Sequence, residues 1–195
     1  MCQLSSYVEM SERREEILKI AVDIIANEGY ASLTMRALAR ASGMKLGALQ
    51  YHFRTSEDLL RALVAYISDA YNQSFSKLQD REEPPSVREV VVFILDDTAG
   101  GNISSDHLWP QLWAMQQMEP LISELVEDLY AYYYSILTKA LIREGGSAPK
   151  AEALALMSLL EGTTIFLGKG RRWANQTKAV RKTILEFIEH RYGSS

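Results

Sequence analysis

The chain has 195 residues, of which 47% are hydrophobic and 24% charged, a composition typical of folded globular proteins and not of disordered ones. This length allows one compact core or two closely packed subdomains and excludes a large multidomain scheme. The formal net charge of −4 at pH 7 argues against a nucleic-acid partner when taken alone, because phosphate binding is driven by Lys and Arg.

Cysteine content and hydropathy narrow the class of protein further. The single cysteine, Cys2, has no partner for an internal disulfide and cannot anchor a thiolate metal site, which favours a reducing cytoplasm. No segment offers the roughly 18 uninterrupted apolar residues of a membrane span, and the first residues lack the layout of a signal peptide. We therefore expect a cytoplasmic protein with no metal, no cofactor and no membrane partner.

The amino-terminal third is predicted to contain two short helices behind a longer one. Apolar residues recur three and four positions apart, which predicts helices along almost the whole chain. The first helix is expected over residues 11–28. Thr34 then opens a short helix that ends at Gly43, and Leu46 begins another. Two short helices joined by a tight glycine turn make a helix-turn-helix.

The rest of the chain is predicted to form a helical bundle. Thr55, followed by acids, predicts the cap of a longer helix that reaches about Leu78, and Pro84-Pro85 then breaks the chain. We expect a DNA-binding domain over 1–56 and a second domain over 57–195, linked by helix 57–79. Later helices are expected over residues 86–97, 106–118, 120–144, 149–167 and 177–192, with a loop around 100–106.

The helix over residues 154–168 is apolar nearly all round, apart from Glu161 and two threonines. Such a helix must be buried on more than one face, and a chain this short has little of its own to cover it. A second copy of the protein is the natural cover, so we expect a homodimer. The expected dimer interface consists of Leu156, Leu160, Gly162, Ile184 and Ile188.

Positive charge is concentrated around the helix-turn-helix. Between Gly29 and Ser56 the sequence has no Asp or Glu. The second short helix is predicted to turn Leu49 and Phe53 inward and polar side chains outward. The major groove of DNA admits one α-helix, and its base edges are read by residues such as Gln, Arg and Lys. These features predict a recognition helix.

The run LTMRALARASGMKLGALQYHFRTSEDLL, residues 33–60, behind ILKIAVDIIANEGYASLT, residues 17–34, resembles the amino-terminal domain of the TetR family of bacterial transcriptional regulators. The resemblance covers roughly the first third of the chain. It implies a dimer whose two recognition helices enter successive major grooves of a near-palindromic double-stranded DNA operator. It also implies a carboxyl-terminal helical domain that binds a small molecule and thereby changes the spacing of the two DNA-binding heads.

The resemblance assigns roles residue by residue. The family often has Thr, Tyr and Lys where Ala48, Gln50 and Ser56 stand, so three usual contacts are changed, and Arg54 offers a replacement for one phosphate contact. Gln50 adds a group able to bond adenine bidentately. Positions matching those that reach base edges are Arg36, Lys45 and Gln50, positions matching phosphate contacts are Thr34, Tyr51 and His52, and Leu46 and Arg54 complete the expected DNA-binding set.

Aromatic residues of the second domain are the candidates for an effector pocket. Aromatics at helical spacing are usually core, and here the implied ligand favours a pocket lining, as small-molecule sites tend to be apolar and aromatic. A small apolar or aromatic effector is the expected ligand. The candidate pocket residues are Phe93, Trp109, Trp113, Met118, Tyr130, Tyr133, Tyr134 and Phe166.

The sequence is therefore interpreted as an all-α protein with an amino-terminal helix-turn-helix domain followed by a larger ligand-binding and dimerisation bundle. Its expected function is that of a sequence-specific DNA-binding transcriptional regulator, a ligand-responsive repressor, and not an enzyme, because no catalytic motif stands out. Two alternatives remain open at this point. One is a DNA binder without an effector, and the other is a helical ligand-binding protein or enzyme that has lost DNA binding.

Overall fold

The computed structural model describes residues 2–80, 82–96, 107–168 and 170–193, and in these ranges the chain is helical with no β-strand. The all-α prediction is thereby confirmed, whereas the expected loop at 100–106 lies outside the described residues. The elements in chain order are α1 (Cys2–Glu28), the 3-10 turn η1 (Tyr30–Ser32), α2 (Met35–Ala41), α3 (Leu46–His52), α4 (Ser56–Gln79), α5 (Val87–Leu95), α6 (Leu108–Met115), α7 (Pro120–Arg143), α8 (Pro149–Leu167), η3 (Ala174–Gln176) and α9 (Thr177–Tyr192).

Local signals set most helix starts. Thr55 and Ser86 each form a capping box, in which the hydroxyl accepts from the backbone three residues on and the acid there accepts from the cap amide. Pro120 and Pro149 begin α7 and α8, where a missing amide hydrogen costs nothing. The first helix begins at Cys2, well before the position expected near Ser11.

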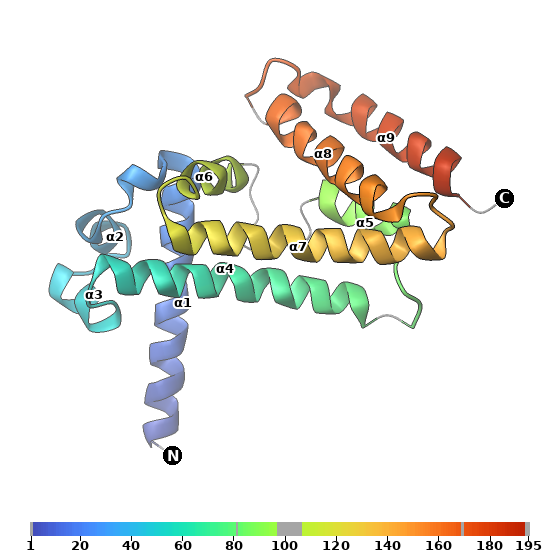
Figure 1. The fold of residues 1–195 in the computed structure, drawn as a ribbon. Helices are drawn as coiled ribbons and strands as arrows, with labels where there is room; N and C mark the ends of the chain where they lie inside the picture. The colour runs from blue at the N-terminus through green and yellow to red at the C-terminus, as the bar shows by residue number, and fades with distance from the viewer. Residues whose placement is uncertain (1, 81, 97–106, 169, 194–195) are drawn as a thin grey trace.

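Two long helices form the spine of the molecule. In Figure 1, α4 and α7 run side by side, with α2 and α3 at one end and α8 and α9 toward the other. Helix α1 packs on α2, α4 and α6, whereas α8 packs on α7 and α9 packs on α5. The helix-turn-helix is thus carried at one end of a continuous helical body.

A buried aromatic cluster holds the spine to α5. Phe75 of α4 stacks on Tyr132 of α7 with ring centroids 3.9 Å apart, and it meets the edge of Tyr133 at 5.4 Å. Phe93 of α5 also packs on the Phe75 ring, with the two centroids 5.9 Å apart. Phe93 and Tyr133 were predicted pocket residues, and both are buried in this core. No helix of the described residues is long and apolar enough to cross a membrane.

Candidate nucleic-acid interface and effector cavity

The helix-turn-helix is built by a cap at its start and a glycine at its turn. The Thr34 hydroxyl accepts a hydrogen bond from the Ala37 amide at 3.1 Å and thereby caps α2. Gly43 adopts φ of 66°, a left-handed conformation that favours glycine, and the Met44 amide donates to the Ala39 carbonyl at 2.8 Å to close the turn. The turn therefore delivers α3 at a fixed angle to α2.

Helices α2 and α3 each have one buried side and one exposed side, as the sequence predicts. The inward residues Leu38, Ala39, Leu49 and Phe53 are all buried. Tyr51 is 75% exposed, which is unusual for an aromatic side chain and leaves it free for contact with another molecule. Of the predicted DNA-binding residues, Leu46 and His52 are half-buried, and the exposed ones are Thr34, Arg36, Lys45, Gln50, Tyr51 and Arg54.

Two arginines of α1 fix the recognition helix from behind. Arg14 donates from Nη1 to the His52 carbonyl at 2.6 Å, and its guanidinium lies 4.4 Å from the centroid of the Phe53 ring. Arg13 donates from Nη2 to the Ser42 carbonyl at 2.8 Å. These bonds occupy carbonyls at the ends of α3 and α2, where intrahelical partners run out.

Burial and the charges of the two arginines all lower the pKa of His52. Partial burial lowers the pKa of His52, and the positive charges of Arg14 and then Arg13 lower it further. These effects favour the neutral imidazole, which carries one N–H donor and no charge.

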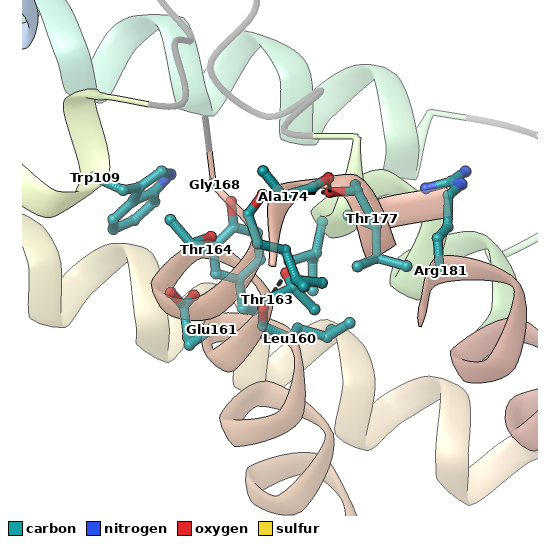
Figure 2. Close-up of a pocket in the computed structure, with 13 residues that line it drawn as sticks. Trp109, Leu160, Glu161, Thr163, Thr164, Gly168, Ala174, Thr177 and Arg181 are labelled. Carbon is teal, nitrogen blue, oxygen red and sulfur yellow. Dashed lines mark hydrogen bonds between the residues drawn. The ribbon is translucent and has the colours of Figure 1, made fainter. Parts of the chain in front are cut away.

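A cavity of about 290 Å³ opens between α5, α8 and the start of α9. Figure 2 shows Trp109 and Glu161 toward one end of it and Arg181 at the other, with Thr163, Thr164 and Thr177 between them. The remaining lining is mostly aliphatic. The lining residues are Ile94, Leu95, Trp109, Tyr133, Leu160, Glu161, Thr163, Thr164, Leu167, Gly168, Ala174, Thr177 and Arg181.

Two of the predicted pocket residues, Trp109 and Tyr133, line this cavity. Tyr130 stacks on Trp109 with centroids 5.7 Å apart, and its hydroxyl accepts a hydrogen bond from Trp113 Nε1 at 2.7 Å, so these two residues form a layer behind the lining. Met118 and Phe166 are 71% and 55% exposed and are not among the lining residues.

Tyr134, the last predicted pocket residue, is half-buried and packs against the hydrophobic core. It is not among the residues that line the cavity. The structure therefore brings only part of the predicted aromatic set to one site.

The predicted dimer residues lie mostly inside the chain. Leu156, Leu160, Ile184 and Ile188 are buried in the core of a single copy, whereas Gly162 is half-buried. The large apolar side chains exposed in this region are instead Leu154, Leu159, Ile165 and Phe166 of α8, Trp173 just before η3, and Phe187 of α9.

A polar contact joins the DNA-binding head to the bundle. Tyr30, just after α1, donates from its hydroxyl to Glu119 Oε1 at 2.8 Å, immediately before α7. Burial, together with this hydrogen bond and the Glu119 charge, raises the pKa of Tyr30 to about 12. The head and the bundle are thus connected by a directional bond between residues far apart in sequence.

Residues 17–63, which include the helix-turn-helix and the start of α4, match the family of bacterial regulatory proteins called the tetR family. The amino-terminal part of this chain is therefore that of a TetR-family protein. The resemblance seen in the sequence is thereby confirmed, and with it the reading of α2 and α3 as the helix-turn-helix of a transcriptional regulator.

Similar proteins extend the likeness beyond the helix-turn-helix domain. The nucleoid occlusion factor SlmA of Vibrio atlanticus is 26% identical over 157 residues, 77% of this chain and 79% of that protein. A protein from Saccharomonospora viridis solved in complex with choline is 25% identical, with a TM-score of 0.74 over 92% of this chain and 97% of that one. Salmonella enterica GusR, 18% identical with a TM-score of 0.67, covers 94% of this chain and 96% of its own and shares the fold.

Three candidate functional residues were not predicted from the sequence. Arg13 and Arg14 lie in the first predicted helix with no pattern that links them to the helix-turn-helix, and Glu161 stands out only as an acid in an apolar helix. Glu161 is half-buried, and a carboxylate partly removed from water in a largely apolar helix is a usable signal in the sequence. Among the described residues, no cluster of three or more His, Cys, Asp or Glu is placed to hold a metal ion.

Proposed function

We propose that this protein is a homodimeric repressor that reads a near-palindromic operator with α3 and releases it when a small molecule enters the α5–α8–α9 cavity. The observation that carries the DNA-binding part is the exposed, acid-free surface of α2 and α3. Its outward side chains include Arg36, Lys45, Gln50 and Arg54, while the buried residues of the same two helices are Leu38, Ala39 and Leu49. Cationic and amide side chains on a short exposed helix suit the major groove.

Individual roles follow from the chemistry of each side chain. Gln50 is the candidate for bidentate contact with adenine, and Arg36 and Lys45 are candidates for guanine. We assign Arg54, just past the end of α3, to a phosphate contact that replaces one of the two changed at Ala48 and Ser56. We assign Thr34, Tyr51 and His52 to phosphate contacts and residues 1–56 to the DNA-binding domain, with α4 as the link to the bundle.

Dimerisation is supported by the apolar surface that α8 and α9 leave uncovered. Ala153, Leu156 and Leu160 form the buried stripe of α8, whereas Leu159 and Phe166 lie on the other side at helical spacing. Gly162 lies between Leu159 and Phe166 on this exposed side of α8. A Cβ at Gly162 would lie 4.0 Å from the Phe166 ring. We propose that this stripe and Phe187 of α9 meet their symmetry mates in a two-fold interface.

Effector action is supported by the position of the cavity and its connection to the head. Trp109 of α6 lines the cavity, and α6 also packs against α1, which holds the recognition helix through Arg14. A ligand that prefers a different placement of α6 therefore shifts the head, by as much as its affinity for the two states differs. Two heads held about one helical turn apart along DNA bind successive major grooves, and other spacings bind weakly.

The experiment that tests the proposal is selection of a random duplex library on the purified protein, followed by gel shift of the winning sequence at two salt concentrations. We expect a near-palindromic motif whose binding falls steeply with salt. A folded, dimeric protein that enriches no sequence would refute the operator-binding function.

A further inference from the structure

A groove with mostly positive side chains lies beside the recognition helix. It runs between α1, the last turn of α3 and the first turns of α4, and in Figure 1 α3 lies at the amino-terminal end of α4. The lining holds three guanidinium groups and one carboxylate, a balance that favours an anion. Its polar and charged residues, all exposed except the half-buried His52, are Arg14, Tyr51, His52, Arg54, Asp58 and Arg61.

The carboxylate of this lining is engaged in capping α4. Asp58 Oδ2 accepts a hydrogen bond from the Thr55 amide at 3.2 Å, and Thr55 Oγ1 accepts one from the Asp58 amide at 3.0 Å. An acid in the first turn of a helix also compensates the partial positive charge of the helix amino terminus. The carboxylate of Asp58 therefore serves the cap, and the arginines determine the charge that the groove offers to a ligand.

Two of the three arginines keep their charge available to the groove. Arg14 is held by the His52 carbonyl and the Phe53 ring, both uncharged partners. Burial first, and then the charges of Arg14 and Arg13, lower the pKa of His52, as expected beside positive groups. Within the described part of the chain, the Arg54 side chain makes no hydrogen bond or ion pair.

The third arginine, Arg61, brings its guanidinium to the start of α4. Its Nη2 and Nε lie 2.8 Å and 3.3 Å from Glu57 Oε1. Side chains on a helix lean toward its amino terminus, and Glu57 in the first turn draws the guanidinium the same way. The TetR family often has Lys where Ser56 stands, directly before Glu57. Arg61 therefore places a cation close to the position where the usual one is missing.

The ion pair between Arg61 and Glu57 can be exchanged at little cost. The two side chains are 60% and 69% exposed, and both donors of Arg61 share one carboxylate oxygen. Exposed pairs of this kind contribute little to stability, because water already screens the charges. A phosphate offers the guanidinium a planar, two-bond contact that the single oxygen of Glu57 does not provide.

We propose that this groove binds a backbone phosphate of the DNA operator, and that Arg61 contacts this phosphate directly by giving up its ion pair with Glu57. The inference rests on the proposed operator-binding function and adds to it a contact outside the helix-turn-helix. Phosphate contacts fix the position of a protein on the duplex without reading bases, so Arg61 contributes to affinity for any sequence. Glu57 competes with DNA for the same guanidinium and thereby weakens binding.

The first test measures duplex affinity by fluorescence anisotropy over a range of salt concentrations. The protein is titrated against the operator duplex obtained by selection and against a duplex of unrelated sequence. The variants are Arg61→Gln, Glu57→Gln and the double variant, and the Tm of each shows that it is folded. Arg88→Gln is the matched control, because Arg88 of α5 is also an exposed helical arginine, with Nε 3.5 Å from Glu189 Oε2.

We expect Arg61→Gln to weaken binding of both duplexes by about tenfold and to reduce the salt slope by about 1 for each subunit, whereas Arg88→Gln changes neither. Glu57→Gln should tighten binding by about threefold, and this gain should be absent from the double variant. An Arg61→Gln protein with wild-type affinity and salt slope would overturn the inference. A missing gain in Glu57→Gln, or an equal gain in the double variant, would refute the competition between Glu57 and DNA.

A second measurement distinguishes direct contact from a general effect of charge. Operator duplexes are prepared in which one backbone phosphate at a time is replaced by a neutral methylphosphonate. At one position in each half-site the replacement should weaken the wild-type protein more than Arg61→Gln, because the variant has already lost that contact. Equal losses for both proteins at every position would rule out a direct contact.

Failure of this inference is distinguishable from failure of the proposed function. If selection yields an operator that Arg61→Gln binds as wild type does, the operator-binding function stands and the phosphate site is refuted. If selection yields no operator, but the unrelated duplex is bound with a salt slope that depends on Arg61, the phosphate site stands and sequence-specific binding is refuted. A folded protein that binds neither kind of duplex refutes both.

Discussion

The bond between Tyr30 and Glu119 offers a direct test of how the head is held to the bundle. Tyr30→Phe removes only the hydroxyl that donates to Glu119 Oε1 at 2.8 Å. A hydrogen bond to a charged acceptor contributes about 1.5–3 kcal/mol when buried. Because Tyr30 is half-buried and water can replace the hydroxyl, we expect a loss of about 1 kcal/mol, which lowers Tm by about 2–4 °C for a chain of this size.

The pH dependence follows from the direction of the pKa shift. The pKa of Tyr30 is raised from 10.0 to about 12 in the folded protein, so its contribution is fully present below pH 10. It is lost as the pH rises from 10 through about 12, because the unfolded chain releases the phenolic proton first. The stability difference between wild type and Tyr30→Phe should therefore shrink over this range.

The assay is urea denaturation of both proteins at pH 8 and at several values above pH 10. Tyr66→Phe is the matched control, since Tyr66 is also half-buried and its pKa is raised first by burial, then by the charges of Glu15 and Asp23. A Tyr30→Phe protein as stable as wild type at pH 8, or a stability difference that does not change above pH 10, would refute the reasoning. The operator affinity of the same variant in the presence of effector reports whether the bond also couples the two domains.

The DNA-binding and dimer surfaces give three further predictions. Arg14→Ala should raise the pKa of His52, measured by NMR titration, and weaken operator binding; an unchanged pKa would contradict the role of the Arg14 charge. Gln50→Ala should change the selected base motif, whereas Arg54→Ala should weaken binding similarly across sequences and reduce the salt slope by about 1. A motif unaltered in Gln50→Ala would show that this side chain reads no base. Phe187→Asp should convert the dimer to a folded monomer in sedimentation equilibrium, while the same change at the exposed Ile142 of α7 should not. A dimer that persists in Phe187→Asp would place the interface elsewhere.

Local patterns in the sequence determined the helices and the inward face of the head. Thr55 carries its own capping partner three residues away, so the start of α4 could be read without knowing what it packs on. Leu38, Leu49 and Phe53 are buried as their spacing predicts, because a short amphipathic helix has only one apolar side to turn inward. Gly43 was identified for the same reason, since a tight turn between two helices restricts which residue fits.

Tertiary structure decided which face of each apolar helix is used. Helix α8 is apolar nearly all round, so its spacing alone did not distinguish Leu156, buried against the chain itself, from Leu159, left 43% exposed. That choice depends on where α7 and α5 lie, and those contacts join distant parts of the sequence. The same holds for Arg14, whose partner His52 is 38 positions away. Helical periodicity is a property of neighbouring residues, whereas burial and pairing are properties of whatever the fold places opposite them.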